Sequence, residues 1–330
     1  MPISRRVIGL AIFSLSIAAC KTYHPKQSNL DTDFGAEGNA AVVAQFDSYK
    51  SKANHCKSSS ASKRVIVSGF GLFSGASFNI SGVVVDTLAN VPLTSISEGA
   101  KVDAPFEVMP GLLKAEDFGG RITQREIKIK DEVIDVCLIL LEVKWDLAAA
   151  IILHEIEKFK PQLVVMTGRG GRDSLQFEGG AVNVAAPRPG FDSAGASVQS
   201  NTPLSNYILK NDAGVPAKNE IPMTWDGAKL AGATKNAVAA INSNYSVVAE
   251  PAARPSNDYI CNNMSYVVLH ALKGFPAKLA GESLEISTSV RGAKAGFLHY
   301  PVSAYNSKIE VKGWIKVLKE ILTVGTARAD

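Results

Sequence analysis

Short apolar segments rich in β-branched residues alternate along this chain with longer segments whose apolar residues recur every three or four positions. The first pattern predicts buried strands, as at 64–68, and the second predicts amphipathic helices, as at 145–158. Further strands are expected at 163–166, 246–249, 284–290 and 295–299, and further helices at 81–90, 227–241, 261–272 and 311–322. This alternation predicts an α/β fold of three layers (α/β/α), in which helices cover both faces of a mostly parallel, twisted sheet. Ligands of such sheets bind at loops beyond the carboxyl ends of the strands.

The first twenty residues have the pattern of a lipoprotein export signal. Arg5 and Arg6 precede an apolar stretch over 7–17, which is shorter than the roughly 20 apolar residues of a spanning helix. An aliphatic residue and two alanines then lead to Cys20. We therefore expect a signal peptide over 1–19 and a lipid on Cys20 that anchors an exported protein to the bacterial cell envelope, at the periplasmic face. Lys21 favours the outer membrane, and an ordinary cleaved signal is the alternative.

The segment 20–63 is polar and rich in Ser, Lys and Asn. Such a composition buries little apolar surface, so we expect a flexible tether with a short helix over 40–49. Residues 64–330 are then expected to form one domain. Within it, the segment 92–142 has few clear signals and is interpreted as an insertion, which could form an oligomer interface.

Charge and cysteine content exclude several classes of function. The net charge of +4 over 330 residues is too small to indicate nucleic-acid binding. No cysteine or histidine pair has the spacing of metal ligands, so neither a metal nor another cofactor is expected. Besides Cys20 the chain has Cys56, Cys137 and Cys261. Because three is odd, at least one thiol stays free or pairs with an external partner.

Three residues of types used in nucleophilic catalysis fall at predicted loop ends of the sheet. Cys261 opens a predicted helix, where backbone amides and the helix dipole favour a thiolate, and where the same amides can bind an oxyanion. His299 ends a predicted strand, and Glu178 lies in a loop from which a carboxylate can orient an imidazole. The alternatives are an inert buried cysteine, an edge histidine and a solvated glutamate. A phosphate site at the glycines of 168–171 is disfavoured because the GK[ST] ending is missing.

A glycine-rich loop with two aromatic residues follows the first predicted strand. Phe70 and Phe73 are flanked by glycines that let the backbone approach a ligand closely. The two rings can wall an apolar pocket or plug the core.

Four segments in this order carry a family resemblance: SGFGLFSGASFN (68–79), GRGGRDSLQFEGGAVN (168–183), YICNNMSY (259–266) and AGFLHYP (295–301). They resemble the motifs of pyroglutamyl peptidase I, a family of cysteine peptidases that remove N-terminal pyroglutamate, and the resemblance extends from about Arg64 to Pro301. It implies a phosphorylase/hydrolase-like fold and a peptide or small-amide substrate.

The resemblance also implies roles for individual residues. Cys261 would be the nucleophile, His299 the general acid and base, and Glu178 the group that orients His299. The implied substrate-binding residues are Phe70 and Phe73, which would sandwich the lactam ring, with Asn79, Arg188, Tyr259 and Ile260. Arg188 would also help to order the site or its oxyanion region.

At four positions the chain departs from the family pattern. Leu72 replaces a proline, Ser74 a glycine, Gly168 a glutamine and Asn263 a histidine. These changes bear on whether the substrate is a pyroglutamyl peptide. The alternative function is a membrane-tethered binding protein that keeps the fold without catalysis. A disulfide from Cys261 to Cys56 or Cys137 would also silence the site.

Overall fold

The computed structural model describes residues 34–52, 55–61, 63–73, 78–90, 120–129, 132–192, 194–210, 219–275, 277–279, 282–284, 286–304 and 308–327. The predicted signal peptide and the predicted lipid site at Cys20 lie outside this range. None of the described helices is long and apolar enough to cross a membrane.

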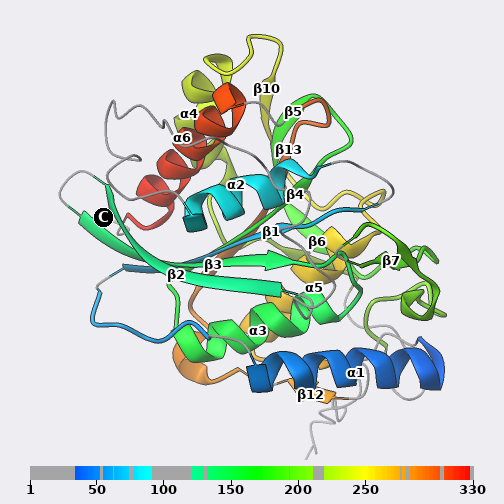
Figure 1. Cartoon of the computed structure of the whole chain (residues 1–330). Coiled ribbons are helices and arrows are strands. Elements are labelled where there is room, and N and C mark those ends of the chain that lie inside the picture. Colours follow the sequence, from blue (N-terminus) through cyan, green and yellow to red (C-terminus); the bar gives the residue numbers. More distant parts are fainter. Residues whose placement is uncertain are drawn as a thin grey trace, which may run out of the picture.

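A seven-stranded sheet forms the centre of the molecule (Figure 1). In spatial order its strands are β10 (Ser246–Ala249), β5 (Ser174–Phe177), β13 (Lys294–Tyr300), β4 (Leu163–Arg169), β1 (Lys63–Phe70), β3 (Glu132–Leu141) and β2 (Gly120–Ile129). Neighbouring strands are parallel except at two pairs, β13 with β5 and β2 with β3. The prediction of an α/β fold with a mostly parallel sheet is therefore confirmed.

Helices cover both faces of the sheet (Figure 1). Side chains of α2 (Ile80–Asn90), α4 (Gly227–Ala239) and α6 (Lys308–Gly325) join one apolar core. Those of α3 (Leu147–Phe159) and α5 (Ile260–Leu272) join the other, with α1 (Gly35–Lys52) packed on the outer side of α3. Three two-stranded sheets pair β6 (Gly180–Val182) with β9 (Glu220–Pro222), β7 (Gly190–Phe191) with β8 (Ser197–Val198), and β11 (Ala277–Leu279) with β12 (Glu282–Leu284).

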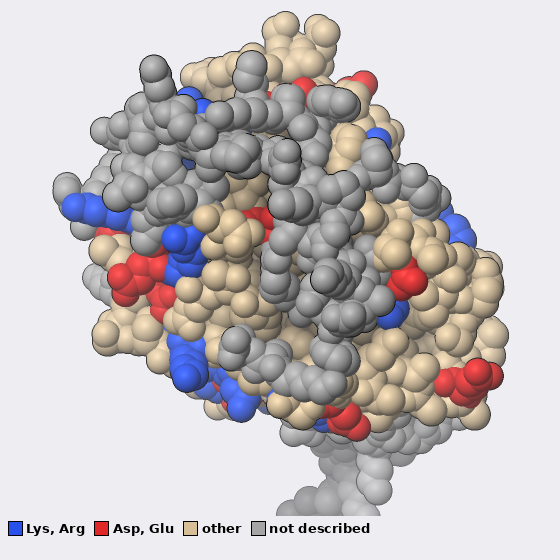
Figure 2. All heavy atoms as spheres, in the orientation of Figure 1, with Lys and Arg blue, Asp and Glu red and all other residues tan. Residues whose placement is uncertain are grey.

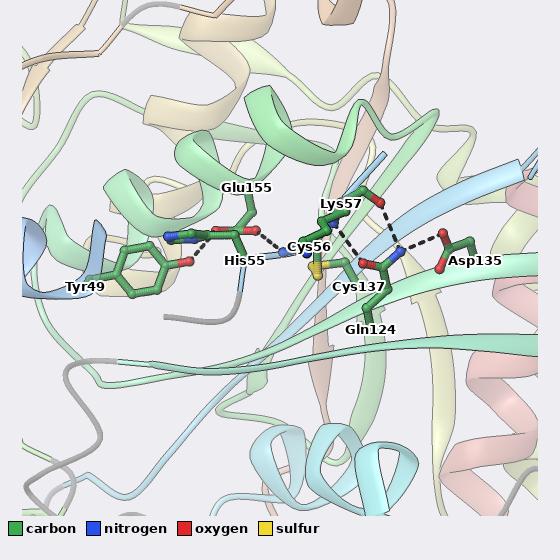
Figure 3. Close-up of a disulfide and its surroundings, with 8 residues drawn as sticks. All are labelled: Tyr49, His55, Cys56, Lys57, Gln124, Asp135, Cys137 and Glu155. Carbon is green, nitrogen blue, oxygen red and sulfur yellow. Dashed lines mark hydrogen bonds and ion pairs between the residues drawn. A yellow bond between two sulfur atoms is a disulfide. The ribbon is translucent and has the colours of Figure 1, made fainter. Parts of the chain in front are cut away.

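The predicted tether is wrong for its described part. The α1 helix is longer than the expected short helix, and Val42, Phe46 and Tyr49 line its buried face. Their spacing of four and three residues places them on one side of a helix, which is why this largely polar segment still packs on the domain. A disulfide between Cys56 and Cys137 of β3 then fastens residues 55–61 to the sheet (Figure 3).

The prediction of an insertion over 92–142 is wrong for the part that the structure describes, residues 120–129 and 132–142. Residues 120–129 and 132–141 form β2 and β3, two strands of the main sheet. The last eight residues of β3 are all buried, as expected for a central strand with helices on both sides. The strand predicted at 284–290 is also absent: β12 ends at Leu284 and a 3₁₀-helix covers Thr288–Val290. The Glu157 carboxylate accepts the Ser287 backbone N–H at 2.8 Å, so this group is not available to a sheet.

Charged side chains of both signs are interspersed over the described part of the face in Figure 2. The surface therefore agrees with the small net charge of the chain.

Candidate active site

Cys261 is the second residue of α5 and the free cysteine of the described residues, with a partly exposed side chain. The structure therefore places Cys261 at the N-terminus of a helix, as predicted. The two other cysteines are joined to each other. The alternative in which Cys261 is consumed by a disulfide is therefore excluded.

His299 lies on β13 beside Cys261. The side chains of Cys261 and His299 hydrogen-bond, and His299 Nδ1 lies 2.7 Å from Glu178 Oε1. The imidazole therefore stands between a sulfur and a carboxylate. Although burial alone lowers the pKa of His299, the hydrogen bonds and charges of Cys261 and Glu178 outweigh it and raise this pKa to about 9. His299 is thus an imidazolium at neutral pH, and a cation beside the sulfur stabilises a thiolate.

Glu178 follows β5 directly and is buried. Its backbone N–H donates to the Phe297 carbonyl at 3.0 Å, which ties the loop to β13 two residues before His299. Burial raises the pKa of Glu178, but hydrogen bonds and charges from His299 and Arg254 outweigh it and hold this pKa below its usual value. The carboxylate therefore stays charged over the neutral range.

Arg254 is a residue of this site that the sequence did not reveal. Its guanidinium forms an ion pair with Glu178 Oε1 and donates from Nε to Oε2 at 3.2 Å. The loop that carries it packs directly on Gly179, where an added Cβ would lie 2.3 Å from the Glu250 carbonyl oxygen. Arg254 lies in a proline-containing loop outside every motif, so no sequence signal singled it out.

Gly168 leaves room for the thiol. It is opposite His299 in the pairing of β4 with β13. A Cβ added there would lie 3.0 Å from Cys261 Sγ and 2.9 Å from Phe297 Cζ. The space that a side chain at residue 168 would need is therefore occupied by the Cys261 sulfur and the Phe297 ring.

We expect Gly168→Ala to slow alkylation of Cys261 by iodoacetamide about tenfold or more, because the added methyl group displaces the sulfur from His299. The measurement is the second-order rate constant of alkylation. Gly171→Ala is the matched control, since an added Cβ at Gly171 meets nothing within 4 Å. Equal rates for the two variants would contradict this account of Gly168.

The predicted substrate-binding residues separate into buried and partly exposed groups. Phe70 and Ile260 are packed in the core with almost no exposed surface. Phe73 is partly buried and contacts the Phe191 ring edge-on, at 6.4 Å between centroids. Asn79 donates to the Gly71 carbonyl at 3.0 Å and accepts from the Ser81 backbone at 3.2 Å, so it joins the aromatic loop to the start of α2. Of the two predicted ring walls, Phe73 is the more accessible.

Arg188 and Tyr259 form a layer next to the first turn of α5. The Arg188 guanidinium lies 4.8 Å from the centre of the Tyr259 ring and forms an ion pair with Asp258. The Tyr259 hydroxyl donates to the Pro189 carbonyl at 2.6 Å. Burial, followed by the charge of Cys261, raises the pKa of Tyr259, so the phenol stays neutral. The structure therefore brings Arg188 to the segment that carries Cys261.

The two asparagines after Cys261 hold α5 in place. Asn262 accepts from the Val182 backbone at 2.9 Å and donates back to the Val182 carbonyl at 2.7 Å. Asn263 exchanges two hydrogen bonds with Asp146, one with its backbone N–H and one with its carboxylate. Asp146 has a φ of 59° and a ψ of −43° and is the central residue of a γ-turn, in which the Leu147 N–H donates to the Trp145 carbonyl at 2.6 Å. Asn263 therefore supports the start of α3 in this chain.

The fold and the site define a class of arrangement: a thiol, an imidazole and a carboxylate gathered beside the strands of an α/β sheet. Two crystal structures of pyroglutamyl peptidase I from Bacillus amyloliquefaciens are similar to this chain. Each has a TM-score of 0.50, with 15% and 14% sequence identity, and the match covers 81% of this chain and 98% and 96% of those chains. At such low identity the likeness concerns the fold. No protein-family model and no curated protein matches the sequence.

Proposed function

We propose that this protein is a cysteine peptidase that removes N-terminal pyroglutamate from peptides or hydrolyses a related small amide. The observation that carries the proposal is the position of His299, which hydrogen-bonds with Cys261 on one side and lies 2.7 Å from Glu178 on the other. A Cys–His–Glu set of this kind, with a partly exposed thiol and a buried imidazole and carboxylate, has the groups that amide hydrolysis through an acyl-enzyme requires.

In the proposed reaction the Cys261 sulfur attacks the carbonyl carbon of the scissile amide. The negative charge that develops on the carbonyl oxygen is stabilised by backbone amides at the start of α5. His299 gives its proton to the leaving nitrogen, the C–N bond breaks, and a thioester remains on Cys261. His299 then takes a proton from water, the resulting hydroxide attacks the thioester, and the C–S bond breaks to release the acid and regenerate the thiolate of Cys261 beside the imidazolium of His299. Glu178, itself held by Arg254, keeps the imidazole oriented through both steps.

Two of the residues that the resemblance assigns to substrate binding are of types that suit a small neutral acyl group. Tyr259 presents an aromatic ring two residues before the nucleophile, and Phe73 is a partly exposed ring on the glycine-rich loop. A lactam ring has no charge, so apolar contacts and a few hydrogen bonds are what can select it.

Hydrolysis of a pyroglutamyl fluorogenic amide by the full chain tests the proposal, with the corresponding prolyl amide as the control substrate. We expect turnover of the pyroglutamyl compound and at least a hundredfold lower turnover of the prolyl compound, which lacks the lactam carbonyl. Cys261→Ala is expected to reduce hydrolysis to the background rate.

The other outcomes separate the substrate from the mechanism. Rapid alkylation of Cys261 without pyroglutamyl turnover would keep a thiol hydrolase and reject the substrate. A folded protein with neither activity nor thiol reactivity would favour a binding protein on the same fold.

We also propose that the protein is exported and held at the cell envelope by a lipid on Cys20. The support is the sequence pattern of residues 1–20. Mass spectrometry of the N-terminal peptide of the protein isolated from its membranes tests this proposal. An N-terminal peptide that starts at Cys20 without added lipid would contradict it.

A further inference from the structure

A second group of titratable side chains lies between α1 and α3, apart from the Cys–His–Glu set. It contains His55, His154 and Glu155. Each offers one donor atom, and these atoms lie no more than 4.8 Å from one another. His55 comes from the segment that was predicted to be a tether, whereas His154 and Glu155 are neighbours on α3.

Glu155 is the fully buried centre of this group. Its Oε1 accepts from the Tyr49 hydroxyl at 2.5 Å and lies 2.7 Å from His55 Nδ1, while its Oε2 accepts from the Cys56 backbone at 2.9 Å (Figure 3). A carboxylate whose oxygens are oriented by neighbouring donors is typical of metal sites, where such outer contacts fix the ligands.

His154 has no comparable partner. Its Nε2 is buried without a hydrogen bond, although the ring is packed edge-on against Phe46 and Tyr49, at 5.9 Å from each. The centres of the His154 and His55 rings are 4.7 Å apart. A buried imidazole nitrogen without a partner is unfavourable unless a ligand satisfies it.

We propose that His55, His154 and Glu155 form a binding site for a divalent transition metal of the zinc type. Two imidazole nitrogens and one carboxylate oxygen are a common protein ligand set for this ion, with water as the fourth ligand. In a tetrahedral zinc site with bonds near 2.0–2.1 Å, ligand atoms are about 3.4 Å apart. The contact between His55 Nδ1 and Glu155 Oε1, now 2.7 Å, must therefore open slightly, and the contacts with His154 must close by at most about 1.4 Å. The metal replaces the proton shared by His55 and Glu155, and this proton is released to solvent.

The charges around the site set limits on its occupant. Lys50 and Lys158 are the cationic side chains that act on His154, and they oppose a further cation. Glu155 supplies a negative charge within the ligand set, and the Tyr49 hydroxyl donates to its Oε1. The ion is thus bound by direct coordination to nitrogen ligands rather than by general electrostatic attraction. Because Mg²⁺ and Ca²⁺ take oxygen ligands, this ligand set favours Zn²⁺. A bound metal would join the segment around His55 to α3 next to the disulfide.

Zinc titration of the full chain by calorimetry, with a competing chelator, tests this site. The parent sequence and the two variants below all carry Cys261→Ala, so that the thiol does not bind zinc, and any contribution from Cys20 is the same in all three. We expect one zinc ion per chain with a micromolar or lower Kd. His154→Phe keeps the packed ring, removes both nitrogens and is expected to weaken binding at least about 100-fold. His270→Phe, at another buried histidine on a helix, is the matched control and should leave the affinity unchanged.

The visible absorption spectrum of the protein loaded with cobalt in place of zinc tests the ligand set without the use of variants. Four-coordinate cobalt with nitrogen and oxygen ligands shows intense visible absorption, without a thiolate charge-transfer band. Absence of zinc binding by the parent, equal affinity in His154→Phe, or a cobalt spectrum with thiolate or six-coordinate character would each overturn the proposal.

Discussion

Glu178→Gln is expected to lower kcat/KM for amide hydrolysis by about 10²–10⁴-fold, the range seen when the orienting carboxylate of a catalytic triad is removed. Glutamine has nearly the same shape, but it lacks the charge that stabilises the imidazolium of His299. It also removes the closer of the two carboxylates that face the Arg254 guanidinium and leaves Glu250, at 3.9 Å, as the remaining counter-ion. Steady-state kinetics on the amide that the parent hydrolyses is the measurement.

The pH profile gives a second readout of the same variant. His299 must be protonated to give a proton to the leaving amine, so activity of the parent is expected to fall as pH rises through about 9. Removing the Glu178 charge lowers the pKa of His299, so this alkaline limb should move to lower pH in Glu178→Gln. The free energy of unfolding changes with pH in the same direction. The contribution of His299 to it is complete below the unfolded pKa of 6.5 and is lost as pH rises through about 9.

Glu250→Gln is the matched control for this prediction. Glu250 also faces Arg254, at 3.9 Å, but no contact joins it to His299 among the described interactions. We expect less than a threefold change in kcat/KM and an unshifted alkaline limb. Similar losses in both variants would show that the charge near Arg254, rather than the contact with His299, is what matters.

Replacing both Cys56 and Cys137 by alanine is expected to lower the free energy of unfolding by about 4 kcal/mol, because the disulfide closes a long loop in the unfolded chain. The two cysteines are 81 residues apart and fully buried. For a domain of this size the corresponding fall in Tm is about 8–15 °C. Chemical denaturation with and without a reductant measures the effect.

The parent treated with a reductant that opens the disulfide is the control, since it should approach the stability of the double alanine variant. In the temperature range where the variant remains folded, its alkylation rate at Cys261 should match that of the parent, because no part of the disulfide contacts the triad. A variant as stable as the oxidised parent would contradict the assigned role of this bond.

Much of the fold follows from local patterns that are visible in the chain. The strand predicted at 246–249 coincides with β10, and the expected helices at 227–241 and 261–272 lie within two residues of α4 and α5. These segments have strong periodicity and clear ends. The α1 helix is different, because its polar composition hides a narrow apolar stripe whose partner on α3 is about a hundred residues away. Its packing depends on a tertiary contact that local pattern does not reveal.

Some residues of the candidate site could likewise be predicted from local sequence and others could not. Cys261 and His299 could be predicted because each stands at the end of a recognisable element, whereas Glu178 was predicted from a loop motif, since β5 before it was not expected. Arg254 could not, since its position depends on how the loop before α5 folds over Gly179. The crowding around Gly168 was equally hidden, because it arises from three elements that meet only in the folded protein.

The disulfide has a further consequence for how the chain acquires its native state. Cys56, Cys137 and Cys261 allow three single pairings, and two of these consume the proposed nucleophile. Oxidation of the fully unfolded chain would therefore trap a large share of molecules as inactive isomers that need reshuffling. A chain that enters an oxidising compartment from its N-terminus presents Cys56 and Cys137 before Cys261, and the 81-residue separation to β3 is shorter than the distance to α5. With the proposed export, the order of emergence would guide the pairing of Cys56 with Cys137 and leave the thiol of Cys261 free.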